Sequence, residues 1–494
     1  MGGAGPGVAR SGNLAIQPGP PLGLKACKRQ PDQELIQRHE REIFPLTKRR
    51  HLFSDVHHFL LYDFFTPEGY VNENVFAYSN RAGDERALIL YHNKYETAQG
   101  WIRSSVAHSI KTDKGDERTL IQKTLGEGLG LHDDPAYFSI FRDGATGLEY
   151  IRGSEDLCKR GLYVELGAYK NHVFTDFREV QDNPSRHYAQ IADYLNGSGV
   201  PSIEGALKEM LLRPLQDVFQ GLVNVDMFRR LMGARITHPQ AQLDQKLMEE
   251  IEENIIDLLQ EAKRLSGGGE DGMTIAREIR RKLEAILYLP ILTSRYPRLQ
   301  PKGVQAAGEY LHKKLTDSST TWGTLFGWLF VHALGRVVSQ GDFAERSRTW
   351  IEEWGFGKTL FGVLRDLGVE EAAAWNSLTV IKWLTGQQRW FEAKLTGQTS
   401  AHARIELLLK DGDLRQFLQV NQHEDIWWFN KEAFEEMLWW LMMVAALTIG
   451  SDPLRPVNAV IEALEGCYSI IQEWQQAEEK SKYQVEKLLS ILNK

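Results

Sequence analysis

Cysteine is scarce in this sequence of 494 residues, which contains only Cys27, Cys158 and Cys467. The three lie far apart, so they cannot form the disulfide framework of a small secreted domain, and no paired Cys-x-x-Cys spacing is present for a zinc site. Such sparing use of cysteine is typical of a reducing compartment. We therefore expect a cytoplasmic protein without a metal site.

Basic residues are not in excess either. The chain has 58 Lys and Arg residues against 66 Asp and Glu residues, which gives a formal net charge of −8 at pH 7. A dedicated nucleic-acid-binding protein needs a basic surface to neutralise phosphates. The charge balance therefore argues against nucleic acid as a partner.

Apolar runs long enough to cross a membrane are also missing. The longest are residues 322–338, interrupted by His332 and Arg336, and residues 437–449. Neither reaches the roughly 18 to 20 apolar residues that a membrane span requires. Both are expected to be buried helices, and we expect neither a membrane partner nor a signal peptide.

Cofactor motifs are absent as well. The triplet at 357–359, Gly-Lys-Thr, resembles the end of a phosphate-binding loop, but Glu352 stands where that loop needs a glycine. The residues before it read as helix rather than strand. The sequence therefore indicates no cofactor.

The pattern that is present changes twice along the chain. Residues 1–30 are rich in Gly and Pro and are expected to be disordered. Residues 31–52 have a helical pattern, which Pro45 should end or kink. Residues 53–183 carry about seven short strands separated by turns, which predicts a sandwich or an open barrel, and we take the antiparallel β-sandwich as the prediction.

Residues 184–494 contain almost no convincing strand. The clearest helix covers 242–265, where apolar residues recur every three or four positions. The glycine-rich stretch 266–272 ends this helix and is a possible internal break. The fold class predicted for the whole chain is α+β and multidomain, with a β-sandwich followed by a large all-α domain.

Residues 75–93 read VFAYSNRAGDERALILYHN and predict a β-hairpin around the turn at 82–84. This hairpin resembles the first one of domain C, the β-sandwich that follows the catalytic barrel in the alpha-amylase family of glycoside hydrolases. Arg81, the acidic turn residues up to Glu85, and Asn93 fall in the order expected for that hairpin.

The resemblance extends over residues 35–225. The segments GWIRSSVAHSIK, QKTLGEGLGLHDD and RGLYVELGAYKNHVFTDFREV look like the region behind the barrel in large bacterial alpha-amylase-like proteins. Residues 31–52 resemble the last barrel helix. By this resemblance the protein is associated with α-glucans in carbohydrate metabolism.

The catalytic part of that family is not found in this chain. Retaining enzymes of the family use a carboxylate nucleophile and a carboxylic acid, in motifs of the types Asp-x-x-x-Asn-His, Gly-x-Arg-x-Asp and Asn-His-Asp. None of these motifs occurs, and only about 50 residues precede the β region, whereas a (β/α)8 barrel takes at least roughly 200. We therefore expect no barrel, no catalytic residues and no hydrolysis by this chain alone.

Two aromatic residues are candidates for contact with carbohydrate. Tyr95 and Trp101 follow the hairpin, and sugar rings stack on exposed aromatic faces. The alternative is that Trp101 fills the core of the sandwich, as large aromatics commonly do. Exposure of the two rings distinguishes these interpretations.

The sequence leads to one main hypothesis and its alternatives. The chain is expected to be the non-catalytic C-terminal portion of an alpha-amylase-like glycoside hydrolase. It is then either a truncated product whose catalytic barrel is missing or separately encoded, or a stand-alone module. As a stand-alone module, it would bind α-glucan or dock a partner.

Overall fold

A computed structural model describes residues 32–54, 56–111, 118–291, 302–315, 318–339, 341–392 and 401–493. The chain divides into two units, Met1–Lys208 and Glu209–Lys494, and each is described by itself. The segment 1–30, expected to be disordered, lies outside the described residues, and Cys27 lies within it.

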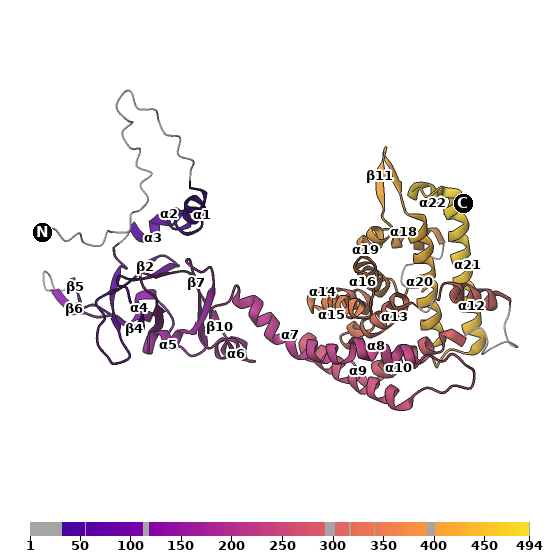
Figure 1. Cartoon of the computed structure of the whole chain (residues 1–494), viewed down its shortest axis with the longest axis horizontal. Helices are drawn as coiled ribbons and strands as arrows, with labels where there is room; N and C mark the ends of the chain where they lie inside the picture. The colour runs from indigo at the N-terminus through magenta and orange to yellow at the C-terminus, as the bar shows by residue number, and fades with distance from the viewer. Residues whose placement is uncertain are drawn as a thin grey trace, which may run out of the picture. The chain divides into compact units, whose positions relative to one another are not determined.

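Eight strands of the first unit form one sheet in the order β8-β7-β10-β3-β2-β1-β4-β9 (Figure 1). All neighbouring strands are antiparallel. The strands are β1 (Leu60–Phe65), β2 (Val75–Ala82), β3 (Glu85–His92), β4 (Ala98–Ser105), β7 (Tyr137–Asp143), β8 (Glu149–Gly153), β9 (Leu162–Leu166) and β10 (Asn171–Gln181). A separate hairpin pairs β5 (His108–Lys111) with β6 (Arg118–Ile121).

This sheet is curled around a single core. Phe141 of β7 and Phe174 of β10 belong to the same buried cluster as Phe64 of β1 and Val164 of β9. The predicted antiparallel β region is confirmed, but the strands do not separate into the two stacked sheets of a sandwich. The reason is that β1 is hydrogen-bonded to both β2 and β4, so one ladder runs from β8 to β9. No (β/α)8 barrel is present in the described part of the chain, as expected.

The hairpin predicted at residues 75–93 is formed by β2 and β3. Its turn has only two residues between the strands, because Ala82 pairs directly with Glu85. Gly83 has a φ of +61°, in the left-handed region that glycine adopts without strain.

Short helices accompany the sheet. Residues 31–52, expected to be one helical segment, form three pieces, α1 (Gln33–Glu42), α2 (Phe44–Lys48) and α3 (Arg50–Ser54), with Pro45 in the first turn of α2. The helices α4 (Leu125–Leu129) and α5 (Ser154–Lys159) contact each other and contribute Leu125 and Leu157 to the core.

The first unit extends past residue 183, where the β region was expected to end. It includes α6 (His187–Leu195) and the start of α7 (Ile203–Leu222). The extension belongs there because Val200 exchanges backbone hydrogen bonds with Glu149 of β8. The Glu149 carboxylate also accepts from the backbone N–H of Ile203.

The second unit is helical, as the sequence predicts. After α7 come α8 (Val225–Gly233), α9 (Gln245–Ser266), α10 (Gly272–Leu287), α12 (Lys302–Lys314), α13 (Ser319–Val331), α14 (Phe343–Glu353), α15 (Phe356–Asp366), α16 (Glu371–Gly386), α18 (Ala401–Leu408), α19 (Gly412–Phe417), α20 (Lys431–Gly450), α21 (Val457–Ser481) and α22 (Val485–Leu492), with two 3₁₀ turns, η1 (Leu289–Ile291) and η2 (Leu334–Val337). A short hairpin joins β11 (Asn421–His423) to β12 (Ile426–Trp428).

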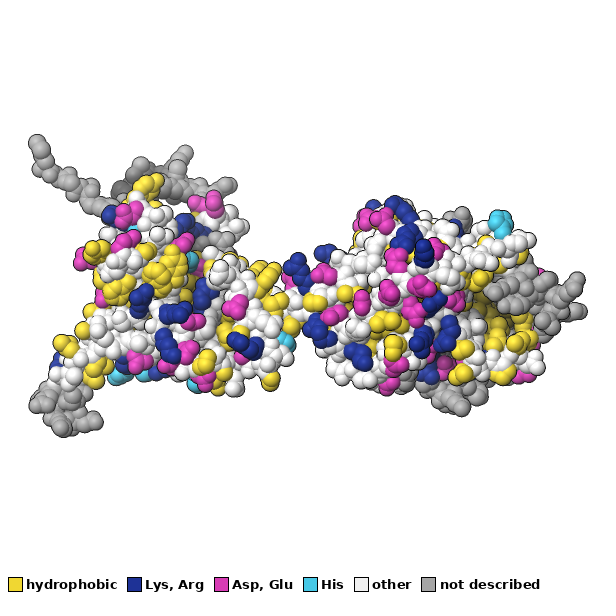
Figure 2. All heavy atoms as spheres, turned by 90° about the horizontal axis from the view of Figure 1, so that it is seen from below, with side chains coloured by type: hydrophobic (Ala, Val, Ile, Leu, Met, Phe, Trp, Pro, Cys, Tyr) yellow, Lys and Arg dark blue, Asp and Glu magenta, His cyan; other side chains and the backbone are white. Residues whose placement is uncertain are grey.

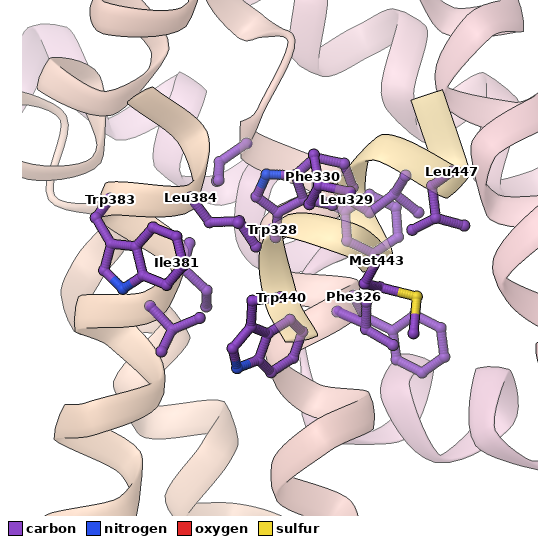
Figure 3. Close-up of a cluster of buried hydrophobic side chains, with 14 of the residues drawn as sticks. Phe326, Trp328, Leu329, Phe330, Ile381, Trp383, Leu384, Trp440, Met443 and Leu447 are labelled. Carbon is purple, nitrogen blue, oxygen red and sulfur yellow. The ribbon is translucent and has the colours of Figure 1, made fainter. Parts of the chain in front are cut away.

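The core of this unit is rich in large aromatic side chains. Trp328 of α13 and Trp383 of α16 are fully buried, and Trp440 of α20 lies beside them (Figure 3). One buried cluster includes residues of both α9 and α10. The stretch 266–272 joins these two packed helices, and Gly267 ends α9 with a φ of +69°.

One described helix has the length and apolar composition of a membrane-spanning segment. It is α20, which contains the apolar run 437–449, and 67% of its most apolar window is buried inside the unit. Trp439 donates from its indole N–H to the backbone of Leu311, so this helix packs within the bundle. The run 322–338 is buried as α13 and η2, which confirms that both apolar runs are core segments.

Candidate functional site

The outer face of strands β4 and β9 carries a line of aromatic side chains. Alternation along β4 buries Gly100 and Ile102 and leaves Trp101 on the outside, partly exposed. In the β4–β9 ladder, Trp101 pairs with Tyr163. The two ring centroids lie 4.8 Å apart.

A second aromatic pair continues this line. Tyr95, just before β4, and Tyr169, just after β9, have ring centroids 6.2 Å apart. Tyr95 is 84% exposed and Tyr169 51% exposed. We call Tyr95, Trp101, Tyr163 and Tyr169 the aromatic strip.

Polar groups lie between the two aromatic pairs. Gln99 and Glu165 pair across the same ladder, and the Tyr163 hydroxyl donates to the Glu165 carboxylate over 3.0 Å. The guanidinium of Arg103 lies 5.1 Å from the centre of the Trp101 ring, within cation–π range. The strip therefore offers aromatic faces for apolar contact and adjacent acceptors and donors for hydroxyl groups.

The structure places both predicted carbohydrate-contact residues on this one surface. Trp101 belongs to no buried cluster of the described core, so it does not fill the interior of the sheet. The sequence prediction missed Tyr163 and Tyr169. The alternation in LYVEL, the sequence of β9, was visible and places Leu162 inside and Tyr163 outside. The pairing of β9 with β4, which brings Tyr163 beside Trp101, was not visible.

A pocket of about 430 Å³ opens where the two ends of the curled sheet approach each other. Its lining comes from β7, β8 and β10 on one side, from β9 on the other, and from the loop after α6. The lining residues are Phe141, Tyr150, Arg152, Leu162, Tyr163, Val164, Glu165, His172, Phe174, Asn196, Gly197 and Ser198.

A histidine in this pocket is paired with a buried carboxylate, which favours its charged form. Nδ1 of His172 lies 2.9 Å from the fully buried carboxylate of Asp143, and Nε2 lies 3.4 Å from the backbone oxygen of Glu165. Burial lowers the pKa of His172, but the hydrogen bond and charge of Asp143 outweigh this and raise it above its usual value. Burial also opposes ionisation of Asp143, and His172 nevertheless lowers the pKa of that carboxyl group.

An arginine in the same pocket has no carboxylate at ion-pair distance among the described residues. Arg152 donates to two backbone oxygens, those of Ile151 at 2.7 Å and Gly197 at 2.9 Å, and its guanidinium lies 5.9 Å from the Tyr150 ring centre. Burial lowers the pKa of Arg152. A largely enclosed cation without an acidic neighbour favours an anionic ligand.

A third surface of the first unit is apolar. The outer faces of β1, β2 and β3, with the residue before β1, expose Phe59, Leu61, Phe76 and Tyr91 by 37–53%. The pairing of Leu61 with Tyr78 and of Phe76 with Tyr91 joins them across the three strands. We call Phe59, Leu61, Phe76, Tyr78 and Tyr91 the apolar face.

The face of the protein drawn in Figure 2 shows apolar side chains gathered in patches on the first unit. Acidic and basic side chains are interspersed over both units on that face. No continuous basic stretch is visible there.

The second unit buries two ionisable groups away from these surfaces. Lys282 of α10 lies 2.8 Å from Nε2 of His332, and burial lowers the pKa of Lys282 to about 8. Glu478 of α21 is 2% exposed, and one of its carboxylate oxygens has no hydrogen-bond partner in the described structure. Neither group lines a described pocket.

Metal ligands do not gather in the described part of the chain, where no group of three or more His, Cys, Asp or Glu residues could hold an ion.

Comparison with known protein families, with curated proteins and with solved structures gives no match for this chain.

Proposed function

We propose that this chain is a non-catalytic α-glucan-binding protein that corresponds to the part of an alpha-amylase-like protein behind its barrel. The observation that carries this proposal is the aromatic strip, with two aromatic pairs exposed along one edge of the sheet. A single exposed aromatic residue would carry little weight, because isolated ones are common on protein surfaces.

The dimensions of the strip suit a chain-like ligand. The β4–β9 ladder pairs Ala98–Ile102 with Leu162–Leu166 and spans roughly 13 Å at about 3.3 Å per residue, and Tyr95 and Tyr169 lie just beyond its Ala98 end. That length accommodates several consecutive sugar rings. Gln99 and Glu165 lie between the two aromatic pairs, where they can bind sugar hydroxyls.

The sugar class comes from the sequence resemblance rather than from the geometry. The resemblance covers residues 35–225, which include the whole strip, and the alpha-amylase family acts on α-glucans. The family's acidic catalytic motifs do not occur in this sequence, so we expect binding without hydrolysis. Cytoplasmic location belongs to the same proposal, in keeping with the free thiols of Cys158 and Cys467.

Affinity electrophoresis tests the proposal. The full chain is expected to be retarded in a native gel that contains glycogen, and W101A and Y163A are expected to lose most of this retardation. W375A is the matched control, because Trp375 belongs to the second unit, is 53% exposed and packs against Phe361 rather than against the strip.

Three results would contradict it. Equal mobility with and without glycogen would remove the binding function. Retardation that W101A and Y163A leave unchanged would remove the strip as its site. Release of reducing sugar by the purified chain, with a mutant control against contamination, would overturn the non-catalytic part.

A second candidate function is docking of a catalytic barrel that is separately encoded or missing. The apolar face supports it, since contiguous exposed apolar side chains on a sheet commonly mark an interface. Leu35, Ile36 and Phe44 of the preceding helices are also exposed by 39–50% and extend the apolar surface available to a partner.

The coding sequence immediately upstream of Met1 and its neighbouring genes provide the first test. If they encode a barrel with the three acidic motifs, that barrel is expected to form a complex with this chain in analytical ultracentrifugation. F76S and L61S should weaken the complex, and Y163S should not. Unrelated sequence in all of these places would count against docking.

A further inference from the structure

The pocket at the meeting ends of the sheet combines three kinds of chemistry. Its floor is aromatic, with the rings of Phe141, Tyr150 and Phe174 in mutual contact at centroid distances of 5.1–5.9 Å. Arg152 supplies positive charge, and the lining also includes His172 and the acidic residue Glu165. These groups come from separate strands, so the pocket exists only in the curled sheet.

The positive groups are prepared for an anion. Two backbone carbonyls hold the Arg152 guanidinium in place, and the described residues provide no carboxylate to neutralise it. His172 is paired on one side with the carboxylate of Asp143, which is fully buried. A guanidinium that is fixed before binding loses little freedom when it meets phosphate oxygens, which it can contact in pairs.

The Glu165 carboxylate limits which anion fits. It accepts from the Tyr163 hydroxyl and lies on β9, whereas Arg152 lies on β8. A carboxylate repels a bare anion but accepts hydrogen bonds from sugar hydroxyls. The suitable ligand therefore carries a phosphate at one end and hydroxyl groups at the other.

We propose that this pocket binds a sugar phosphate, with its phosphate against Arg152 and His172, its hydroxyls toward Glu165, and its ring on the aromatic floor. The volume of about 430 Å³ is in the range of small-ligand pockets. A phosphate monoester carries about −1.5 to −2 charges at pH 7, which suits Arg152, a cation of this pocket with no carboxylate at ion-pair distance among the described residues. This binding is separate from glucan binding, although Tyr163 and Glu165 border both surfaces.

Calorimetric titration of the full chain with glucose 1-phosphate, glucose and inorganic phosphate tests the proposal. Glucose 1-phosphate is expected to bind at least about tenfold more tightly than either of the other two, because only it engages both ends of the pocket. R152Q should weaken its binding by about tenfold or more. R160Q should leave binding unchanged, because Arg160 is an exposed arginine of the same unit outside the pocket.

A second pair of variants keeps the test valid if R152Q does not fold. Ser198 is exposed at the rim of the pocket, so S198E places a negative charge there without touching the core, and S198Q adds similar bulk without charge. S198E is expected to weaken glucose 1-phosphate binding several-fold more than S198Q does. Equal binding by the two variants would overturn the proposal, as would equal affinity for glucose or for inorganic phosphate.

W101A separates this proposal from glucan binding. Trp101 does not line the pocket, so this variant should lose retardation by glycogen and keep its affinity for glucose 1-phosphate. R152Q should keep its retardation by glycogen and lose affinity for glucose 1-phosphate. If W101A or R152Q abolished both kinds of binding, the two surfaces would not be separate sites and the proposal would fail.

Discussion

The buried carboxyl group of Glu478 should make the stability of the helical unit depend on pH. Burial, with the negative charge of Glu435 as the next cause, raises its pKa from 4.5 to about 7, against the smaller opposing effects of Lys431 and Lys314. The folded unit therefore binds this proton more tightly than the unfolded chain, so its stability falls as pH rises from about 4.5 to about 7. Well above pH 7 the carboxyl group is ionised in both the folded and the unfolded state. The full cost of burying its charge, roughly 3 kcal/mol at about 1.36 kcal/mol per unit of pKa shift, then lowers the free energy of unfolding.

The substitution E478Q removes this charge and keeps the shape of the side chain. Its gain in free energy of unfolding should be near zero at pH 4.5 and rise to as much as roughly 3 kcal/mol at pH 8. Urea denaturation followed by tryptophan fluorescence measures it, because Trp101 is the only one of the 13 tryptophans that lies before residue 209. Fluorescence therefore reports mainly on the second unit.

Another glutamate of the same helix provides the control. Glu473 is exposed on α21 and is not among the charges that shift the pKa of Glu478, so E473Q should change stability little, and by the same amount at both pH values. If E478Q and E473Q gave the same difference between pH 4.5 and pH 8, burial of Glu478 would not govern the pH dependence and the reasoning would be refuted.

Two further predictions concern burial and close packing. Burial lowers the pKa of Lys282 from 10.5 to about 8, so its charge destabilises the folded unit below pH 8, and this cost disappears as the pH rises to 10.5. K282M should therefore raise the free energy of unfolding by up to roughly 3 kcal/mol at pH 7 and by little at pH 10.5. Equal gains at both pH values in urea denaturation would contradict this. A Cβ atom at Gly126 would lie 2.1 Å from the sulfur of Cys158, so G126A should lower the melting temperature measured by circular dichroism. G147D is the control, because Gly147 has open space around it and a φ of +75°, so this substitution should cost only backbone strain. An unchanged melting temperature for G126A would show that α4 and α5 separate easily.

The sequence patterns predicted local structure better than long-range pairing. The hairpin of residues 75–93 and the helix around 242–265 were predicted because each depends on neighbours in sequence. The antiparallel β region was predicted, but its continuous ladder was not, since alternation shows which residues face inward but not that β1 bonds both β2 and β4. The contact of Val200 with Glu149 could not be predicted for the same reason, because it leaves no local pattern.

The candidate sites illustrate the same limit. Tyr95 and Trp101 were identified as aromatic residues beside a hairpin, but their partners Tyr163 and Tyr169 come from a strand that pairs with β4 only in the folded sheet. The Arg152 pocket gave no sequence signal. Its defining property is that no carboxylate of the described residues lies at ion-pair distance from Arg152, and only the folded structure reveals this.

The pairing of β4 with β9 also has a consequence for how the first unit folds. Local hairpins such as β2–β3 need to close only a two-residue loop, whereas Ala98 must find Leu166 across several intervening strands and helices. Contacts so distant in sequence form late, because the entropy of closing the long loop is lost before any contact compensates for it. A nascent chain in which β9 has not yet been synthesised presents Trp101 without Tyr163, and so lacks half of the proposed glucan site. Retention on glycogen would therefore distinguish completely folded β units from partly folded ones.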